Sequence, residues 1–179
     1  MLKALLATAT VLMTSMPVLA ESSHDDHVRL FDTVKEVGVR VYINPGDVCD
    51  PEVTGKGKFY GFYAGANQMM VICQEKALKS GVYNQQYSWT EEDYDTLRHE
   101  AHHMVQDCMD RTLDAKLDSV YDKPTVFASN ILTKRKFNWV VETYTRGGRH
   151  MVVMELEAFG VAEQNNPLEQ IKDIKRYCM

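Results

Sequence analysis

The chain reads TEEDYDTLRHEAHHMVQDC over residues 90–108, and this stretch predicts one long helix. No proline or glycine interrupts residues 91–110, and Thr90 is a suitable N-cap, with Asp93 in the capping-box position. Apolar side chains recur at helical spacing, at Tyr94, Leu97, Ala101, Met104, Val105 and Cys108. We therefore expect an amphipathic helix that packs its apolar face into the protein.

The same helix carries the pattern H-E-x-x-H at His99, Glu100 and His103. Residues four apart lie one turn above each other, so the two imidazoles can reach one metal ion. A carboxylate beside them can accept a proton from a water molecule that the metal activates. The pattern indicates a zinc hydrolase. Three ordinary histidines matching by chance are the competing interpretation, and a metal shared by His99 and His102 would leave Glu100 without its place beside the water.

A catalytic zinc site needs a third protein ligand, with the fourth position left to water. Residues 151–159 read MVVMELEAF and place Glu155 and Glu157 in an otherwise apolar stretch. Burying a carboxylate there is costly unless it is paired or binds a metal. Two residues apart on a helix, the two side chains point in different directions, so only one can face the zinc. The other is expected to face solvent or a cation.

Together these residues resemble the zincin metallopeptidases, and more narrowly the gluzincins, in which a glutamate from a later helix joins H-E-x-x-H. Several such families carry it as Glu-x-x-Ala, which Glu155 and Ala158 match. The resemblance implies His99, His103 and Glu155 as ligands of one Zn²⁺ per chain, and Glu100 as the general base. It implies hydrolysis of a peptide or protein substrate. The thermolysin-type Asn-Glu-x-x-Ser-Asp signature is absent.

This activity would also need a second donor for the oxyanion, and Tyr144 and His150 are the two candidates because they lie shortly before the glutamate helix. The alternative is a zincin-shaped binding or structural module, stapled by disulfides and without turnover. An intact Glu100 favours the enzyme, because a module that needs only the metal has no use for that base.

The first 20 residues contain one charge, Lys3, and an apolar run too short to span a bilayer. Small residues before Glu21 complete the pattern of a secretory signal peptide. We expect residues 21–179 to form a single domain, exported to the periplasm or outside the cell and without stable membrane insertion after cleavage. The formal charge of −5 becomes −6 without Lys3, which disfavours nucleic acid as a partner.

The cysteines all lie in the part expected to be exported, and their even number predicts two disulfides. Of the three possible pairings we favour two bonds that bracket a strand-rich segment and tie the tail to the motif helix. These are Cys49 with Cys73 and Cys108 with Cys178.

Strands are expected before helices. Three β-rich stretches, residues 37–43, 59–63 and 69–73, are followed by helical patterns at 74–79, 91–110, 112–121, 125–145 and 149–164 and near the C-terminus. We therefore expect an α+β, zincin-like fold, with a small, mostly antiparallel sheet followed by a helical half that carries the metal site. The His24–His27 cluster reads as a solvated tail.

Overall fold

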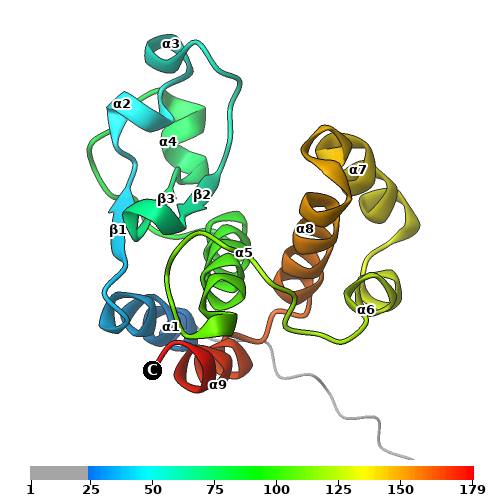
Figure 1. Ribbon diagram of the computed structural model, residues 1–179. Coiled ribbons are helices and arrows are strands. Elements are labelled where there is room, and N and C mark those ends of the chain that lie inside the picture. Colours follow the sequence, from blue (N-terminus) through cyan, green and yellow to red (C-terminus); the bar gives the residue numbers. More distant parts are fainter. Residues whose placement is uncertain (1–23) are drawn as a thin grey trace, which may run out of the picture.

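The computed structural model describes residues 24–179, and the expected signal peptide, residues 1–20, lies outside the described residues. The described part is an α+β protein built around helix α5 (Glu91–Asp107), near the centre of the molecule (Figure 1). A small sheet lies on one side of α5, and helix α8 (Gly148–Glu163) packs along another. Helix α5 therefore has the sheet on one side and α8 on another.

Helix α5 forms where the sequence places it, and its first turn has the expected cap. The Thr90 hydroxyl accepts a hydrogen bond from the backbone N–H of Asp93, and the Asp93 carboxylate accepts one from the N–H of Thr90. This reciprocal pair satisfies two helix-end donors. Helices α1 (His24–Glu36) and α9 (Pro167–Tyr177) pack on each other and on α5. Their shared core includes Leu30, Val34, Met70, Ile72, Leu97, Met104 and Ile174.

The sheet consists of β1 (Arg40–Ile43), β2 (Gly61–Ala64) and β3 (Met69–Ile72), in the order β1-β3-β2. Strand β3 is parallel to β1, with Arg40 opposite Met69, and antiparallel to β2. The expectation of a mostly antiparallel sheet is wrong, because the sheet is mixed. Strand β2 has a strand partner on one edge only within residues 24–179.

The lengths of the connections explain the mixed sheet. A short turn joins β2 to β3, and such a turn forces antiparallel neighbours. Between β1 and β3 the chain instead passes through α2 (Gly46–Cys49), α3 (Pro51–Thr54) and β2, which returns it to the starting end of β1. This longer connection allows β3 to run parallel to β1.

A helix precedes the first strand, so the interpretation of His24–His27 as a solvated tail is wrong. These residues begin α1, where His27 is 1% exposed. The His27 ring stacks on Tyr94 with centroids 4.1 Å apart, and its Nε2 lies 2.6 Å from an Arg98 guanidinium nitrogen, which donates to it. Tyr94 and Arg98 lie about 70 positions from His27 along the chain, so local sequence patterns give no sign of these contacts.

The helix expected at residues 112–121 is absent, and the chain there is irregular. Arg111 and Ala115 adopt positive φ angles of 66° and 69°, which no α-helix contains. Several backbone N–H groups of this stretch bind α5 or α8. The N–H of Asp114 donates to the Asp107 carboxylate, and that of Asp118 donates to the Gln106 carbonyl. The segment is thus held by the two site helices.

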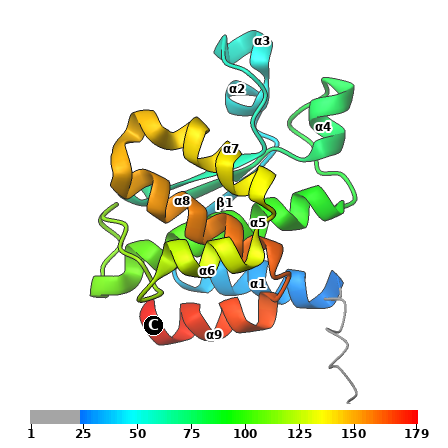
Figure 2. The same cartoon turned by 90° about the vertical axis from the view of Figure 1, so that its right-hand side faces the viewer.

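The helical stretch expected at residues 125–145 is divided in two. Helix α6 (Pro124–Ile131) ends where Leu132 takes an extended conformation, and α7 (Lys134–Tyr144) begins with Thr133 as its N-cap. Figure 2 shows α6 and α7 beside α8, and all three are in contact. The helical half thus covers the side of α8 that faces away from α5. Helix α4 (Glu75–Ser80) follows β3, as expected.

Both expected disulfides are present. Cys49–Cys73 joins α2 to the residue after β3, and Cys108–Cys178 joins the end of α5 to the end of α9. The second bond closes a separation of 70 residues, for which the chain-entropy model gives a stabilisation of about 4 kcal/mol. Between residues 24 and 179, no helix has both the length and the apolar character needed to cross a membrane.

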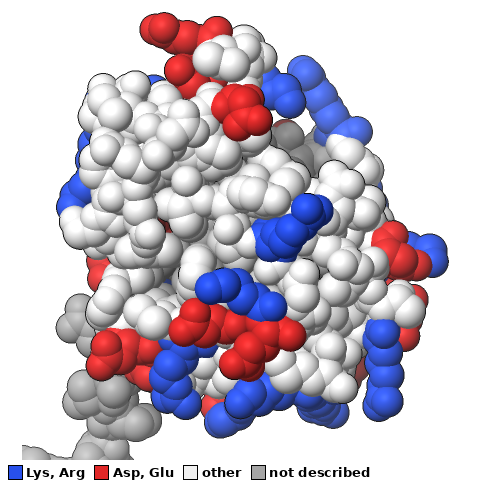
Figure 3. All heavy atoms as spheres, turned by 90° about the vertical axis from the view of Figure 1, so that its left-hand side faces the viewer, with Lys and Arg blue, Asp and Glu red and all other residues white. Residues whose placement is uncertain are grey.

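Charged side chains on the face shown in Figure 3 gather mainly in its lower part, where both signs are interspersed. Ion pairs of side chains occur within α1 and α9, for example Arg29 with Asp26 and Lys172 with Glu169. Such exposed pairs stabilise little. They make the surface there mixed in charge.

Gly61 marks a close approach of β2 to α5. A Cβ added there would lie 2.7 Å from both the Val71 carbonyl oxygen and Thr96 Cγ2. We expect Gly61→Ala to lower the free energy of unfolding by about 1–3 kcal/mol, because the backbone oxygen cannot move aside cheaply. Urea denaturation would measure this, with Gly57→Ala as the control, since a Cβ at Gly57 meets nothing within 4 Å. Equal effects of the two substitutions would contradict the expectation.

Candidate metal centre

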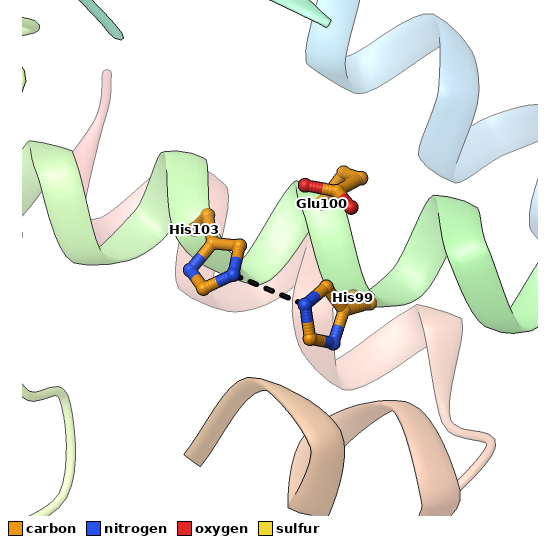
Figure 4. A group of neighbouring side chains, drawn as sticks. All are labelled: His99, Glu100 and His103. Atoms are coloured by element: carbon orange, nitrogen blue, oxygen red, sulfur yellow. Dashed lines mark hydrogen bonds between the residues drawn. The ribbon is translucent and has the colours of Figure 1, made fainter. Parts of the chain in front are cut away.

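The side chains of His99 and His103 face each other from neighbouring turns of α5. Their Nε2 atoms are 3.1 Å apart, and both residues are buried. Figure 4 shows the two rings pointing toward one another, with the Glu100 carboxylate to one side of the pair. One possible ligand atom from each of His99, Glu100 and His103 lies within 4.8 Å of the other two.

Helix α8 brings Glu155 to the same two nitrogens. Its Oε2 lies 3.3 Å from His99 Nε2, and its Oε1 lies 3.6 Å from His103 Nε2. Glu155 Oε2 and His99 Nδ1 are buried and make no hydrogen bond. Two imidazole nitrogens and one carboxylate therefore converge on one buried point, which is the donor set of a catalytic zinc site. These residues fit a divalent metal ion.

The charges of this group are strongly coupled. Burial alone would raise the pKa of Glu155, but the nearby His103 and His99 rings lower it to about 2. Burial alone would lower the pKa of His103, but Glu155 and Glu100 raise it to about 9. The carboxylate is thus ionised and draws positive charge to the point between the two rings.

Glu100 lies against β2 and is 6% exposed. Burial raises the pKa of Glu100, the positive charges of His99 and His103 oppose this rise, and Glu155 adds to it. Gly61 of β2 lies close to it, since a Cβ built there would be 3.5 Å from Glu100 Cγ. Glu100 therefore lies between the histidine pair and the sheet.

Of the two expected surroundings of Glu157, solvent or a cation, solvent is wrong. Glu157 is fully buried, and its carboxylate accepts five hydrogen bonds, from His102, Gln106 and Ser119 side chains and from the backbone of Val120 and Tyr121. Burial would raise the pKa of Glu157, but these donors, His102 first, lower it to about 2. Glu157 thus ties α5 to the irregular segment after it.

His102 belongs to the hydrogen-bonded group around Glu157 and does not face the point shared by His99 and His103. Its Nε2 donates to Glu157 Oε1 at 2.8 Å. Burial lowers the pKa of His102, although its hydrogen bond to the Glu157 carboxylate opposes the change. The structure does not form the alternative His99–His102 pair.

Of the two candidate oxyanion donors, only Tyr144 reaches the centre. Burial raises the pKa of Tyr144, and the charges of Glu155 and Glu100 raise it further. His150 is exposed, and its Nε2 donates instead to the Leu117 carbonyl oxygen at 2.8 Å.

Two cavities open on either side of the centre, with volumes of about 430 and 470 Å³. They share Gly61, His99, Glu100 and Tyr144. The smaller follows the end of β2 and has small side chains such as Ala64 and Ala66. The larger has an aromatic lining formed by Phe59, Tyr60, Trp139 and Phe159. The centre therefore lies where the two cavities meet.

Comparison with known proteins identifies a family but no individual relative. No curated protein matches the chain, and no solved structure does. Residues 18–179 match the model of a family described as a domain of unknown function, DUF8637. Because the match covers nearly the whole chain, the protein belongs to the DUF8637 family.

Proposed function

We propose that this protein is a zinc-dependent peptidase of the zincin type. His99, His103 and Glu155 would hold one Zn²⁺ per chain. The convergence of the two Nε2 atoms and the Glu155 carboxylate supports the proposal most strongly. Two imidazoles and a carboxylate suit zinc, and three protein ligands leave a position for water. The placement of the sheet before the motif helix, and of a helical half after it, agrees with a zincin-like fold.

Glu155 is a better third ligand than Glu157 or Glu100. Its oxygens lie near both Nε2 atoms, whereas the oxygens of Glu157 are occupied by five donors. Glu100 remains free for proton transfer, because it projects beside the histidine pair and opens to both cavities.

Zinc, when bound, would polarise the scissile carbonyl and make water a stronger nucleophile at neutral pH. Glu100 takes a proton from the attacking water as the new C–O bond forms. The same carboxyl group then passes that proton to the leaving amine as the C–N bond breaks. The Tyr144 hydroxyl donates a hydrogen bond to the carbonyl oxygen as negative charge develops there.

The substrate is a peptide or protein segment that occupies the two cavities. Among residues 24–179, β2 has no strand partner on the edge opposite β3, and this supports an extended binding mode, because such an edge offers backbone donors and acceptors to a peptide. Gly61 at the junction of the cavities lets a substrate backbone come close to Glu100. The two disulfides support an exported location, periplasmic or extracellular.

Replacing Tyr144 by Phe is expected to lower kcat by about 10²- to 10³-fold with little change in KM, because the lost hydroxyl acts on the transition state. Steady-state cleavage of a fluorogenic peptide would measure this. Tyr42→Phe is the matched control, since Tyr42 is exposed on β1 and lines neither cavity. A variant at Tyr144 with unchanged kcat would remove this residue from the mechanism.

The proposal as a whole is tested by incubating the purified protein with a diverse peptide library and identifying the fragments by mass spectrometry. We expect cleavage that a zinc chelator stops and that added zinc restores. A protein that binds zinc but cuts no peptide would instead be a binding module. Cleavage that is unaffected by the chelator would exclude the proposed chemistry.

A further inference from the structure

We propose that Gln106 is a positioning residue that keeps the proton of His103 on Nδ1 and so turns the Nε2 lone pair toward the metal position. The inference rests on the proposed zinc centre. Gln106 lies on α5 one turn after His103 and is fully buried. Its carboxamide contacts His103 on one side and α8 on the other.

The surroundings fix which way the Gln106 amide faces. One end lies 3.0 Å from the Met154 carbonyl oxygen and 3.1 Å from Glu157 Oε1. A carbonyl oxygen and an ionised carboxylate only accept hydrogen bonds, so this end must be the NH₂ group. The other end is therefore the amide oxygen.

That oxygen lies 2.8 Å from His103 Nδ1. An amide oxygen only accepts, so Nδ1 must carry a hydrogen. The same holds whether the ring is neutral or protonated. In the neutral ring the free lone pair is then on Nε2, the atom that faces His99 and Glu155. The acceptors on α8 thus fix the orientation of the Gln106 amide, and the amide oxygen in turn selects one tautomer of His103.

The other histidine has no such partner. His99 Nδ1 makes no hydrogen bond, and its ring is held by packing on Phe159, with centroids 4.3 Å apart. The hydrogen bond that orients this candidate centre from outside therefore acts on His103 alone. Glu157 makes the arrangement rigid, because the same Oε1 that accepts from Gln106 also accepts from His102 and from the backbone of Val120.

Gln106→Met tests the inference, because methionine has a similar length and neither donates nor accepts in this way. We expect zinc affinity to fall by about 10- to 100-fold, as for other lost outer-shell partners. The matched control is Gln170→Met. Gln170 is also buried, and its amide donates to the Arg98 carbonyl on α5 rather than to a side chain of the centre. Both substitutions remove a buried amide, so a loss of affinity through general destabilisation would affect both.

Zinc dissociation constants from competition with a chromophoric chelator give the first readout, and ¹⁵N–¹H NMR of the imidazole rings gives the second. At alkaline pH, where the ring is neutral, we expect His103 of the zinc-free wild type to carry its proton on Nδ1. Under the same conditions we expect the Gln106→Met ring to show a mixture of tautomers.

Equal zinc affinities in the two variants, or a neutral wild-type His103 protonated on Nε2 alone, would overturn the inference. The wild-type NMR result stands even if the Gln106 variant does not fold. A wild type that binds no zinc would overturn the proposed function itself, which is a different outcome from equal affinities in two zinc-binding variants.

Discussion

Glu100→Gln is expected to lower the rate of peptide cleavage by about 10²- to 10⁴-fold while the protein still binds one zinc ion. The amide has nearly the same shape as the carboxylate but cannot take a proton from water, so the loss falls on acid–base catalysis. Glu100 lies to one side of the histidine pair, and Glu155 reaches the two Nε2 atoms from α8, so the ligand set is expected to survive. Initial rates on a fluorogenic peptide, together with zinc content, would measure both effects.

The control for this variant is Glu91→Gln, in the first turn of the same helix. Glu91 is exposed and lines neither cavity beside the candidate centre. Its substitution is expected to change the rate by less than about twofold, in line with other surface substitutions. Full activity in Glu100→Gln would mean that another group, or none, acts as the base.

Substitutions of Glu155 and Glu157, the two buried glutamates of α8, are expected to have opposite effects on zinc binding and on stability. Glu155→Gln should weaken zinc binding by more than about 100-fold, since even the loss of an outer-shell partner can cost that much. Glu157→Gln should instead lower the free energy of unfolding of the zinc-free protein by about 3 kcal/mol. The new NH₂ group would point at the donors Ser119 Oγ and the Tyr121 N–H. Zinc titration and urea denaturation of both variants would measure these effects.

Each of these variants is the control for the other, because both convert a buried carboxylate on the same helix into an amide. Glu155 Oε2 makes no hydrogen bond, so its substitution should affect stability less than that of Glu157. If Glu157→Gln lost the zinc and Glu155→Gln kept it, the third ligand would be wrongly assigned.

The features that the sequence predicted well are those with local signals. The capping box at Thr90, the apolar spacing of α5 and the pattern at His99, Glu100 and His103 all lie within one helix, where spacing determines geometry. The two disulfides were predicted from which segments they would join, and the structure contains both.

The features that the sequence did not reveal depend on contacts between distant segments. The sequence around Glu157 does not predict that residues 119–121 supply three of its hydrogen-bond donors. The same contacts explain why the stretch at 112–121 is not helical despite a suitable pattern, since its N–H groups bind α5 and α8. Gln106 was missed because a lone glutamine has no motif, although its position one turn after His103 was a usable signal.

Zinc content per chain, determined by mass spectrometry of the purified wild type and of His103→Ala, tests the central claim most directly. We expect one equivalent of zinc in the wild type and none in the variant, with circular dichroism showing that both are folded. No zinc in the wild type, or one equivalent in both proteins, would contradict the assignment of the metal centre to His99, His103 and Glu155.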